Sequence, residues 1–392
     1  MTPPAPSALR RFFALSPLGN QHPSLHGLRV LAIVSVVQHH VTDTLEFLGK
    51  MPVDAAWAAR SRSVFFGMDL FFVLSGFLIG LVLLRARDAK APGAAARFYL
   101  RRAARTFPSY YVVIAALVAL FGLTAAQRAH LPFELIYLTN FMPLMWTDVV
   151  MSWGWSLALE EQFYLAAPLL VWGATKLAPR RALIALAALC VAALVVRAGV
   201  YASRAQWTDD SLERALYFST FARFDTLVAG VLCALVHHRH GATLTASLSV
   251  PRNRGLVAVA GLSCLWSLLQ PDALLPLPAF HVLAWGTITS VMYACVLALL
   301  LHGGEGLLRS ALSLPAFRGV ATLGYGVYLV HVPVCHTLVA RLARALHERG
   351  TPMGVVWCAS LAAALVASFA AAYVLHLCVE KPALRLRDRF GF

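Results

Sequence analysis

The chain has 392 residues, of which 59% are hydrophobic and 13% are charged, and its mean hydropathy is +0.70. Soluble domains are about one quarter charged, so this composition argues against a soluble fold and predicts a chain surrounded by lipid. The formal net charge of +15 does not predict nucleic-acid binding. The basic residues fall in short clusters between apolar runs, as in cytoplasmic loops of membrane proteins, and no basic helix or aromatic platform accompanies them.

No apolar segment followed by a cleavage site is found in residues 1–27, so we expect the first apolar helix to be retained as a signal anchor. The seven cysteines lie in apolar runs and form no C-x-x-C pair. They predict small buried side chains and indicate neither a zinc site nor a disulfide framework.

Ten segments are apolar and long enough to cross a bilayer as helices, which needs about 20 residues. They are 28–48, 64–84, 108–124, 153–174, 181–200, 219–236, 255–270, 282–302, 319–339 and 354–377. The segment 131–147 is too polar to span and is predicted to be interfacial or re-entrant. We therefore expect an all-α polytopic membrane protein with a cytoplasmic arm (1–21), a membrane domain (22–385) and a cytoplasmic tail (386–392).

Lys and Arg residues are distributed unequally between the two sides of this arrangement. The side of the N-terminus carries roughly twice as many as the opposite side, which favours cytoplasmic N- and C-termini. Arg341, Arg344 and Arg349, which follow the outer end of the ninth span, fit this orientation poorly.

Ionisable residues lie inside four of the predicted spans: His40, Asp69, Glu160 with Glu161, and His331. At about 1.5 Å per residue all of them fall at a similar depth, in the outer half of the bilayer. Ionisable groups at that depth cost several kcal/mol on most scales, so they usually face a polar interior and carry function. The pattern predicts a buried polar chamber.

A second group of charges precedes the third span. Arg97, Arg101 and Arg105 are spaced four residues apart, so they share one face of a helix, with Arg102 beside it. Such a stripe suits a phosphorylated ligand that enters from the cytoplasm. The alternative is that these arginines only anchor the helix to lipid headgroups.

Seven motifs follow one another along the chain. They are Ser24-Leu-His-Gly-Leu-Arg-Val-Leu-Ala, with Arg29 and His40 separated by ten residues; Phe66-Gly-Met-Asp-Leu-Phe-Phe-Val-Leu-Ser-Gly-Phe-Leu-Ile-Gly80; Arg101-Arg-Ala-Ala-Arg-Thr-Phe-Pro-Ser-Tyr110; Trp155-Ser-Leu-Ala-Leu-Glu-Glu-Gln-Phe-Tyr164; Arg223-Phe-Asp-Thr-Leu-Val-Ala-Gly230; Leu323-Gly-Tyr-Gly-Val-Tyr-Leu-Val-His-Val-Pro333; and Val379-Glu-Lys-Pro382. In this order the motifs resemble acyltransferase 3, a family of integral-membrane acyltransferases that O-acylate sugars and other acceptors. The resemblance covers about residues 22–385.

Two positions in the first motif need comment. His26 stands where the family commonly has Asp, which puts any contact made by that Asp in doubt. His39 precedes His40, and adjacent helical residues differ by about 100° in direction, so only one of the two imidazoles can point directly into a chamber. The ten-residue spacing from Arg29 favours His40.

The resemblance implies acyl-CoA, with an acetyl group expected, as co-substrate, a hydroxyl of a sugar or glycan as acceptor, and the bacterial cell membrane as location. It implies no tightly bound cofactor and no metal. Acyl transfer to a hydroxyl needs a base, which we assign to His40, and a carboxylate, either Glu160 or Asp69, to orient it. The residues expected to hold the CoA phosphates are Arg29, Arg101, Arg102 and Arg105. Those expected around the acceptor are Glu161, Trp155, Arg223, Asp225, Tyr328 and His331.

Several alternatives stay open. His40 could deprotonate the acceptor directly or become acylated itself, and His331 could serve only as a hydrogen-bonding group between helices. Arg223 with Asp225 could be a structural ion pair, and Trp153 with Trp155 an outer aromatic belt. The run 237–240, which is rich in His, could bind a metal ion, but its place in a basic loop favours a solvated cluster at the inner edge.

Two other classes of protein compete with an acyltransferase. A proton-coupled secondary transporter also buries His, Asp and Glu, but no duplication of its halves is found in this chain. A non-catalytic lipid-binding or scaffold protein would leave the charges of the chamber unexplained.

Overall fold

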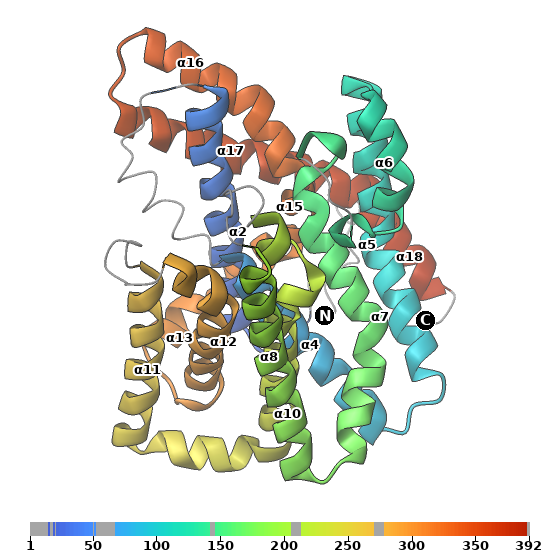
Figure 1. Cartoon of the computed structure of the whole chain (residues 1–392), viewed down its shortest axis with the longest axis vertical. Coiled ribbons are helices and arrows are strands. Elements are labelled where there is room, and N and C mark those ends of the chain that lie inside the picture. Colours follow the sequence, from blue (N-terminus) through green and yellow to red (C-terminus); the bar gives the residue numbers. More distant parts are fainter. Residues whose placement is uncertain are drawn as a thin grey trace, which may run out of the picture. The chain divides into compact units, whose positions relative to one another are not determined.

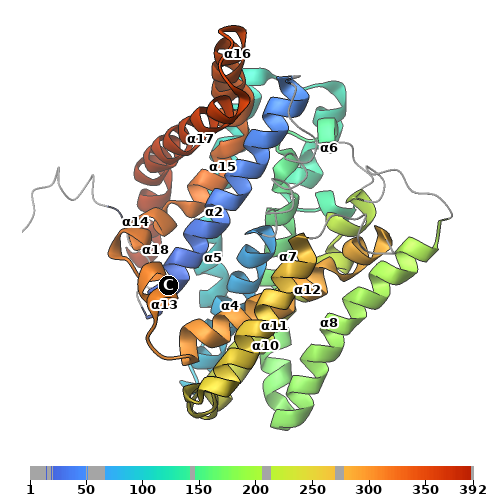
Figure 2. The ribbon, with the colours of Figure 1, turned by 90° about the vertical axis from the view of Figure 1, so that its left-hand side faces the viewer.

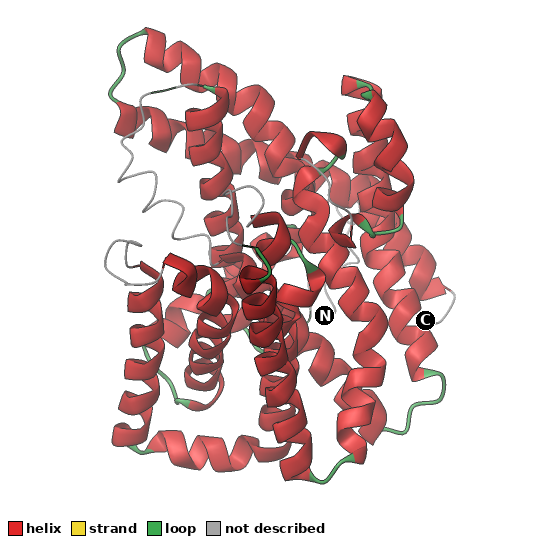
Figure 3. Ribbon diagram, viewed as in Figure 1, coloured by secondary structure: helices red, strands yellow, loops and turns green. Residues whose placement is uncertain are grey.

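The computed structural model describes residues 15, 19, 21–49, 51, 67–141, 146–204, 213–269 and 278–389. Within these ranges the chain forms helices joined by loops and no strand (Figure 3), which confirms the all-α prediction. Parts of the predicted segments lie outside the described residues, namely most of the arm 1–21, residues 64–66 and 270 of two spans, 142–145 of the interfacial segment and 390–392 of the tail.

Seven helices in the described part of the chain are long and apolar enough to cross a membrane. They are Gly67–Asp88, Ala94–Phe121, Pro179–Ala202, Thr220–Ser249, Leu283–His302, Gly324–Glu348 and Met353–Arg389. The chain is thus a multi-pass membrane protein. The other three predicted spans are also helical but are more polar or shorter; they are α2 (Ser24–Asp43), α7 (Trp155–Lys176) and α11 (Pro251–Leu269). Ten spans therefore stay a prediction.

The helices belong to two compact units, which we treat separately. Unit 1 contains Met1–Ala58, Arg97–Ala119 and Ser310–Phe392, and unit 2 contains Ala59–Ala96 and Leu120–Arg309. Of the predicted site residues, unit 1 holds the two histidines, Tyr328 and the arginines before the third span. Unit 2 holds the carboxylates, Arg223 and Trp155.

Unit 1 is built around α2, α15 (Gly324–Val334) and α17 (Met353–Leu375), which lie side by side (Figure 2). Two glycines allow this close packing. A Cβ atom at Gly324 would lie 2.8 Å from the side chain of Ile33 on α2, and one at Gly326 would lie 3.0 Å from that of Ala372 on α17. The remaining elements of unit 1 are η1 (Thr44–Leu48), most of α5 (Ala94–Phe121), part of α13 (Leu307–Leu312), α14 (Pro315–Thr322), η8 (Cys335–Val339), α16 (Ala340–Glu348), η9 (His376–Glu380) and α18 (Lys381–Arg389).

Unit 2 is centred on α4 (Gly67–Asp88) and α10 (Thr220–Ser249). A Cβ at Gly76 would overlap the carbonyl oxygen of Leu227, and one at Gly230 would overlap that of Val73. Glycine at both motif positions thus lets the two backbones touch. The other main elements are α6 (Ala125–Leu135), α7, α8 (Pro179–Ala202), η6 (Glu213–Tyr217), α11 and α12 (Pro278–His302).

Helix α10 leaves helical geometry at His240, and its last part runs toward α11 along the lower edge of Figure 1. The segment predicted to be interfacial contains only α6 and the single turns η3 (Thr139–Phe141) and η4 (Trp146–Asp148) among its described residues. Neither α6 nor these turns is long enough to span a bilayer.

Candidate active site

Arg29 and His40 lie on one continuous helix, α2. Eleven positions correspond to about three turns and about 16 Å of rise, so both side chains leave the same face. Both are half-buried. The ten-residue spacing therefore places a cation and an imidazole on one side of α2, at different heights.

His40 meets His331 of α15, and the sequence positions explain why. Seven residues before each histidine stand Ile33 and Gly324, which are in contact. Since seven residues return a helix to nearly the same face, the two helices run parallel and keep this register up to the histidines. The ring centroids of His40 and His331 are 4.9 Å apart, at an interplanar angle of 58°.

The His331 ring is fixed by its own helix. Its Nδ1 lies 2.7 Å from the carbonyl oxygen of Tyr328, and the side chain is completely buried. A carbonyl oxygen can only accept a hydrogen bond, so Nδ1 carries the proton, and in a neutral imidazole Nε2 is then the acceptor. Tyr328, also a predicted site residue, is half-buried, and its ring lies 5.3 Å from that of His331.

His39 has a different environment from His40. Its Nε2 lies 3.1 Å from Oδ2 of Asp43, one turn further along α2, and its ring meets that of His40 edge-on at 5.2 Å. The spacing of four residues between His39 and Asp43 is a sequence signal for this pair that the motif analysis overlooked. Because His39 is engaged by Asp43, the geometry favours His40 as the reactive imidazole.

The arginine stripe lies on α5, whose helix begins 14 residues before the predicted span. Arg97, Arg102 and Arg105 are half-buried, while Arg101 is exposed. The Tyr325 hydroxyl of α15 donates a hydrogen bond of 2.9 Å to the carbonyl oxygen of Thr106, directly after the stripe. This bond ties the basic end of α5 to the helix that carries His331.

Asp69, predicted as a catalytic carboxylate, is completely buried in unit 2. Its Oδ1 accepts a hydrogen bond of 2.5 Å from Nη2 of Arg223 on α10, and its Oδ2 accepts one of 2.6 Å from the indole of Trp285 on α12. The carboxylate thus joins three helices. Sequence reasoning missed Trp285, because no motif or spacing distinguishes it within the apolar run of α12.

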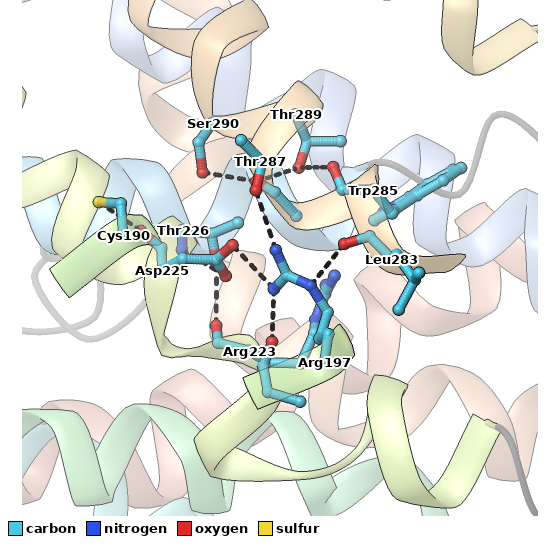
Figure 4. A network of polar contacts seen from close by, with 12 residues as sticks. Cys190, Arg197, Arg223, Asp225, Thr226, Leu283, Trp285, Thr287, Thr289 and Ser290 are labelled. Atoms are coloured by element: carbon cyan, nitrogen blue, oxygen red, sulfur yellow. Dashed lines mark hydrogen bonds and ion pairs between the residues drawn. The ribbon is translucent and has the colours of Figure 1, made fainter. Parts of the chain in front are cut away.

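Asp225 pairs with Arg197 of α8, with 2.8 Å between Oδ2 and Nη1 (Figure 4). The Arg197 guanidinium also donates to the carbonyl oxygens of Leu283 and Ala222, each at 2.6 Å, and to the hydroxyl of Thr287 at 2.9 Å. The alternative in which Arg223 and Asp225 form an ion pair with each other is wrong, because Arg223 pairs with Asp69. Residues two apart on a helix point in nearly opposite directions, so each finds a partner on another helix.

Glu160 and Glu161 of α7 are both half-buried. The Tyr164 hydroxyl donates to Oε2 of Glu160 at 3.2 Å and lies 2.9 Å from the Ser75 hydroxyl of α4. Glu160 is thus oriented by its own helix and is less enclosed than Asp69.

Trp155 begins α7 and is buried, with 8% of its surface exposed, and Trp153 is exposed to 6%. These values contradict the outer aromatic belt, whose rings would face lipid. The Trp155 ring instead packs on Tyr217 and Phe218, with centroids 5.0 and 4.9 Å away. The side-chain amide of Asn140 donates to the carbonyl oxygens of Trp155 and Phe218, which fixes the start of α7 against the segment before α10.

Glu134 lies in the last turn of α6, and its carboxylate accepts hydrogen bonds from the backbone N–H groups of Val150 (2.9 Å) and Met151 (2.7 Å). Burial raises the pKa of the Glu134 carboxyl, although these two N–H groups act in the opposite direction. This residue, which the motifs did not indicate, orders the loop that leads into α7.

No group of three or more His, Cys, Asp or Glu side chains in the described part of the chain could hold a metal ion. In the run 237–240, Nδ1 of His237 lies 3.0 Å from Nε2 of His302, and Nε2 of His238 lies 2.7 Å from a carboxylate oxygen of Asp88. These contacts link α10 to α12 and α4.

The sequence was compared with protein families, curated proteins and solved structures. The sequence profile of a family described as "Acyltransferase domain" matches residues 22–376. The chain is 28% identical to peptidoglycan O-acetyltransferase OatA of Listeria monocytogenes over 333 residues, which are 80% of this chain and 49% of that protein. It is 28% identical to the putative peptidoglycan O-acetyltransferase YrhL of Bacillus subtilis over 349 residues, 84% of this chain and 50% of that protein.

O-acetyltransferase OatA of Staphylococcus aureus is 22% identical over 331 residues, 80% of this chain and 50% of that protein. The chain therefore spans about half the length of these relatives. No solved structure matches it significantly.

Proposed function

Because the chain belongs to the acyltransferase 3 family, we propose that it transfers an acyl group, expected to be acetyl, from cytoplasmic acyl-CoA to a hydroxyl group of a sugar or glycan. The names of its relatives, which are peptidoglycan O-acetyltransferases, support a glycan of the cell surface as acceptor. The family match does not support the transporter alternative.

The contact between His40 and His331 carries this proposal. A half-buried imidazole in contact with a buried one, inside a helical membrane protein, is suited to general base catalysis, because a neutral imidazole has a nitrogen lone pair that can take the proton of a hydroxyl group. In direct transfer His40 takes the proton of the acceptor hydroxyl while the oxygen attacks the thioester carbonyl. The C–S bond then breaks, and the proton passes to the CoA thiolate.

A second route gives the same products through an acylated His40. The His40 nitrogen attacks the thioester, CoA leaves as thiolate, and the acceptor hydroxyl then displaces the acyl group and gives its proton to the thiolate. Both routes place positive charge on the His40 ring, either as imidazolium or as acylimidazolium.

We propose that the arginines of unit 1 bind the acyl donor, acyl-CoA. Arg102 and Arg105 are half-buried and are held on α5 beside the Tyr325–Thr106 bond, and Arg29 leaves the same face of α2 as His40. Guanidinium groups recognise phosphate bidentately, so Arg29, Arg101, Arg102 and Arg105 are proposed to hold the phosphates of CoA. With the N-terminus in the cytoplasm, these cations lie at the inner end and His40 lies about 16 Å further along α2.

For the residues of unit 2 the environments favour different roles. Glu160 and Glu161 are proposed as the catalytic and acceptor-binding carboxylates because both are half-buried, and Trp155 is proposed to contact the acceptor. Tyr328, which belongs to unit 1, is likewise proposed to contact the acceptor. Asp69, Arg223 and Asp225 are enclosed in ion pairs, so we propose that they position α4, α8, α10 and α12.

Purified full-length protein with labelled acetyl-CoA tests the proposal, with water or an N-acetylglucosamine oligomer as acceptor. The wild-type protein should release CoA about 10²- to 10⁴-fold faster than the His40→Ala variant. The His40→Ala variant should still bind CoA. His39→Ala is the matched control and should stay active. An inactive His39→Ala beside an active His40→Ala would reverse the assignment, and no CoA release by the wild type would refute the proposed function.

A further inference from the structure

We propose that His331 is the positioning residue of His40: its Nε2 holds the His40 ring in the reactive orientation and stabilises the positive charge that the ring acquires. This inference rests on the proposed role of His40 as base or nucleophile. From the sequence we expected a carboxylate to orient His40, whereas this proposal gives that role to His331. His331 was expected to bind the acceptor, and the proposal replaces that role.

The first argument is the register of α2 and α15. The contact of Ile33 with Gly324 recurs seven residues later as the contact of His40 with His331. Because a Cβ at Gly324 would come within 2.8 Å of Ile33, glycine at this position brings α15 close to α2 where the two histidines follow. The packing of the helices thus determines the distance between the rings.

The second argument is the tautomer of His331. The Tyr328 carbonyl oxygen fixes the proton on Nδ1, so the lone pair of a neutral ring is on Nε2. A lone pair beside His40 accepts an N–H of that ring, which leaves the other His40 nitrogen unprotonated and able to act as base or nucleophile. This is the orienting function of the carboxylate in a Ser-His-Asp triad, performed by a neutral group.

The third argument is the separation of the rings. His237 and His302, whose nitrogens lie 3.0 Å apart, have ring centroids 5.0 Å apart. The centroids of His40 and His331 are 4.9 Å apart, so the two rings are close enough for the proposed hydrogen bond between their nitrogens to form.

Other titratable groups near His40 are His39, paired with Asp43 on the same helix, and His336 on η8. His331 differs from both of them, since it is completely buried and anchored to its own backbone. It therefore presents one defined nitrogen and one defined orientation, which a positioning residue requires.

The test uses His331→Asn and His331→Gln in the full-length protein, because the Asn amide replaces only Nδ1 of the ring and the Gln amide replaces only Nε2. An Asn amide can still donate to the Tyr328 carbonyl but does not reach the position of Nε2, whereas a Gln amide reaches it. We expect His331→Asn to lose about 100-fold in kcat, within the range of groups that assist proton transfer, with KM for acetyl-CoA and for the acceptor unchanged. His331→Gln should recover part of this loss, and His347→Asn, on the exposed part of α16, should behave as wild type.

Two further readouts separate positioning from a structural role. The acid limb of the kcat/KM profile should move to lower pH in His331→Asn, because a positive charge on His40 loses its partner. In the His40→Ala background the same substitution should have no additional effect, since it acts through His40.

A higher acceptor KM with unchanged kcat, or equal losses in both backgrounds, would overturn the proposal and assign His331 to the acceptor or to folding. Those outcomes leave the function of His40 intact. Wild-type turnover by His40→Ala would instead remove the proposed function itself.

Discussion

Arg223 donates a hydrogen bond of 2.5 Å to Asp69, and both side chains are almost completely buried. The second oxygen of Asp69 accepts from Trp285, and the Arg223 guanidinium lies 4.6 Å above the ring of Tyr217. The two charges compensate each other inside an apolar unit, and neither is available without breaking the pair. The motif residues Asp69 and Arg223 therefore serve first to hold α4, α10 and α12 together.

Asp69→Asn should destabilise the protein strongly. Removing one member of a buried ion pair leaves an uncompensated charge, which costs about 3–5 kcal/mol. Thermal unfolding of the detergent-solubilised protein measures this loss. Asp69→Asn combined with Arg223→Gln should be more stable than Asp69→Asn alone, and Asp88→Asn, at an exposed site, should change stability little. A stable Asp69→Asn protein that is merely inactive would return Asp69 to the catalytic groups.

Gly286 of α12 faces the second ion pair. A Cβ there would lie 2.8 and 2.9 Å from the carboxylate oxygens of Asp225 and 3.1 Å from Nη1 of Arg197. Gly286→Ala should therefore lower the unfolding temperature, although alanine otherwise stabilises a helix by up to about 1 kcal/mol relative to glycine. Gly199→Ala on α8 is the matched control, because nothing lies within 4 Å of its Cβ position. If both variants gained stability, α12 would not be packed tightly on this pair.

The sequence predicted the helices and the similar depth of His40 and His331, but neither the contact between these two histidines nor the ion pairs. Helix period and apolar length locate spans, and the positions of the histidines within two predicted spans put them at a similar depth. Arg197 carried a usable signal, because an arginine inside a predicted span usually faces the protein interior and has a partner there. Trp285 and Gly286 carried none, since their roles depend on which helix faces Asp69 and Asp225, and helical periodicity does not specify neighbours.

Arg102→Gln with Arg105→Gln should weaken binding of acetyl-CoA more than binding of an acetyl-pantetheine thioester, because only CoA has the nucleotide phosphates that guanidinium groups grip. Binding of both donors to the purified protein measures the difference. Lys at the same positions should substitute incompletely. The matched control, Arg341→Gln with Arg344→Gln on α16, removes the same charge at exposed positions and should spare both donors. Equal losses for the two donors would mean that Arg102 and Arg105 anchor the helix or support folding.

Glu134→Gln should destabilise the loop before α7, because one amide oxygen replaces two carboxylate oxygens that accept from Val150 and Met151. An unsatisfied buried N–H costs about 1–3 kcal/mol. The raised pKa of Glu134 in the folded state means that the folded protein binds the proton more tightly than the unfolded chain does. The wild type therefore loses stability as pH rises from about 4.3, the value of an unperturbed Glu, through the pKa of the folded carboxyl.

The gap in unfolding temperature between wild type and Glu134→Gln should accordingly be widest at low pH and shrink as pH rises through that window. Glu305→Gln, at a side chain that is 78% exposed, should show no such gap. A gap that widens toward neutral pH would mean that the ionised carboxylate is the favoured form in the folded protein.

The last prediction concerns sidedness. If the N-terminus is cytoplasmic, Arg29 lies at the inner end of α2, and His40, about 16 Å further along the helix, lies toward the outer side. Sealed inside-out vesicles that receive acetyl-CoA on their exposed cytoplasmic face should then acetylate an N-acetylglucosamine oligomer trapped in the lumen. The same oligomer added outside the vesicles should stay unmodified, and vesicles with His40→Ala should release no CoA above background. Acetylation restricted to the side of the CoA would show that donor and acceptor enter from one face, and the proposed transfer across the membrane would be wrong even with the enzyme class correct.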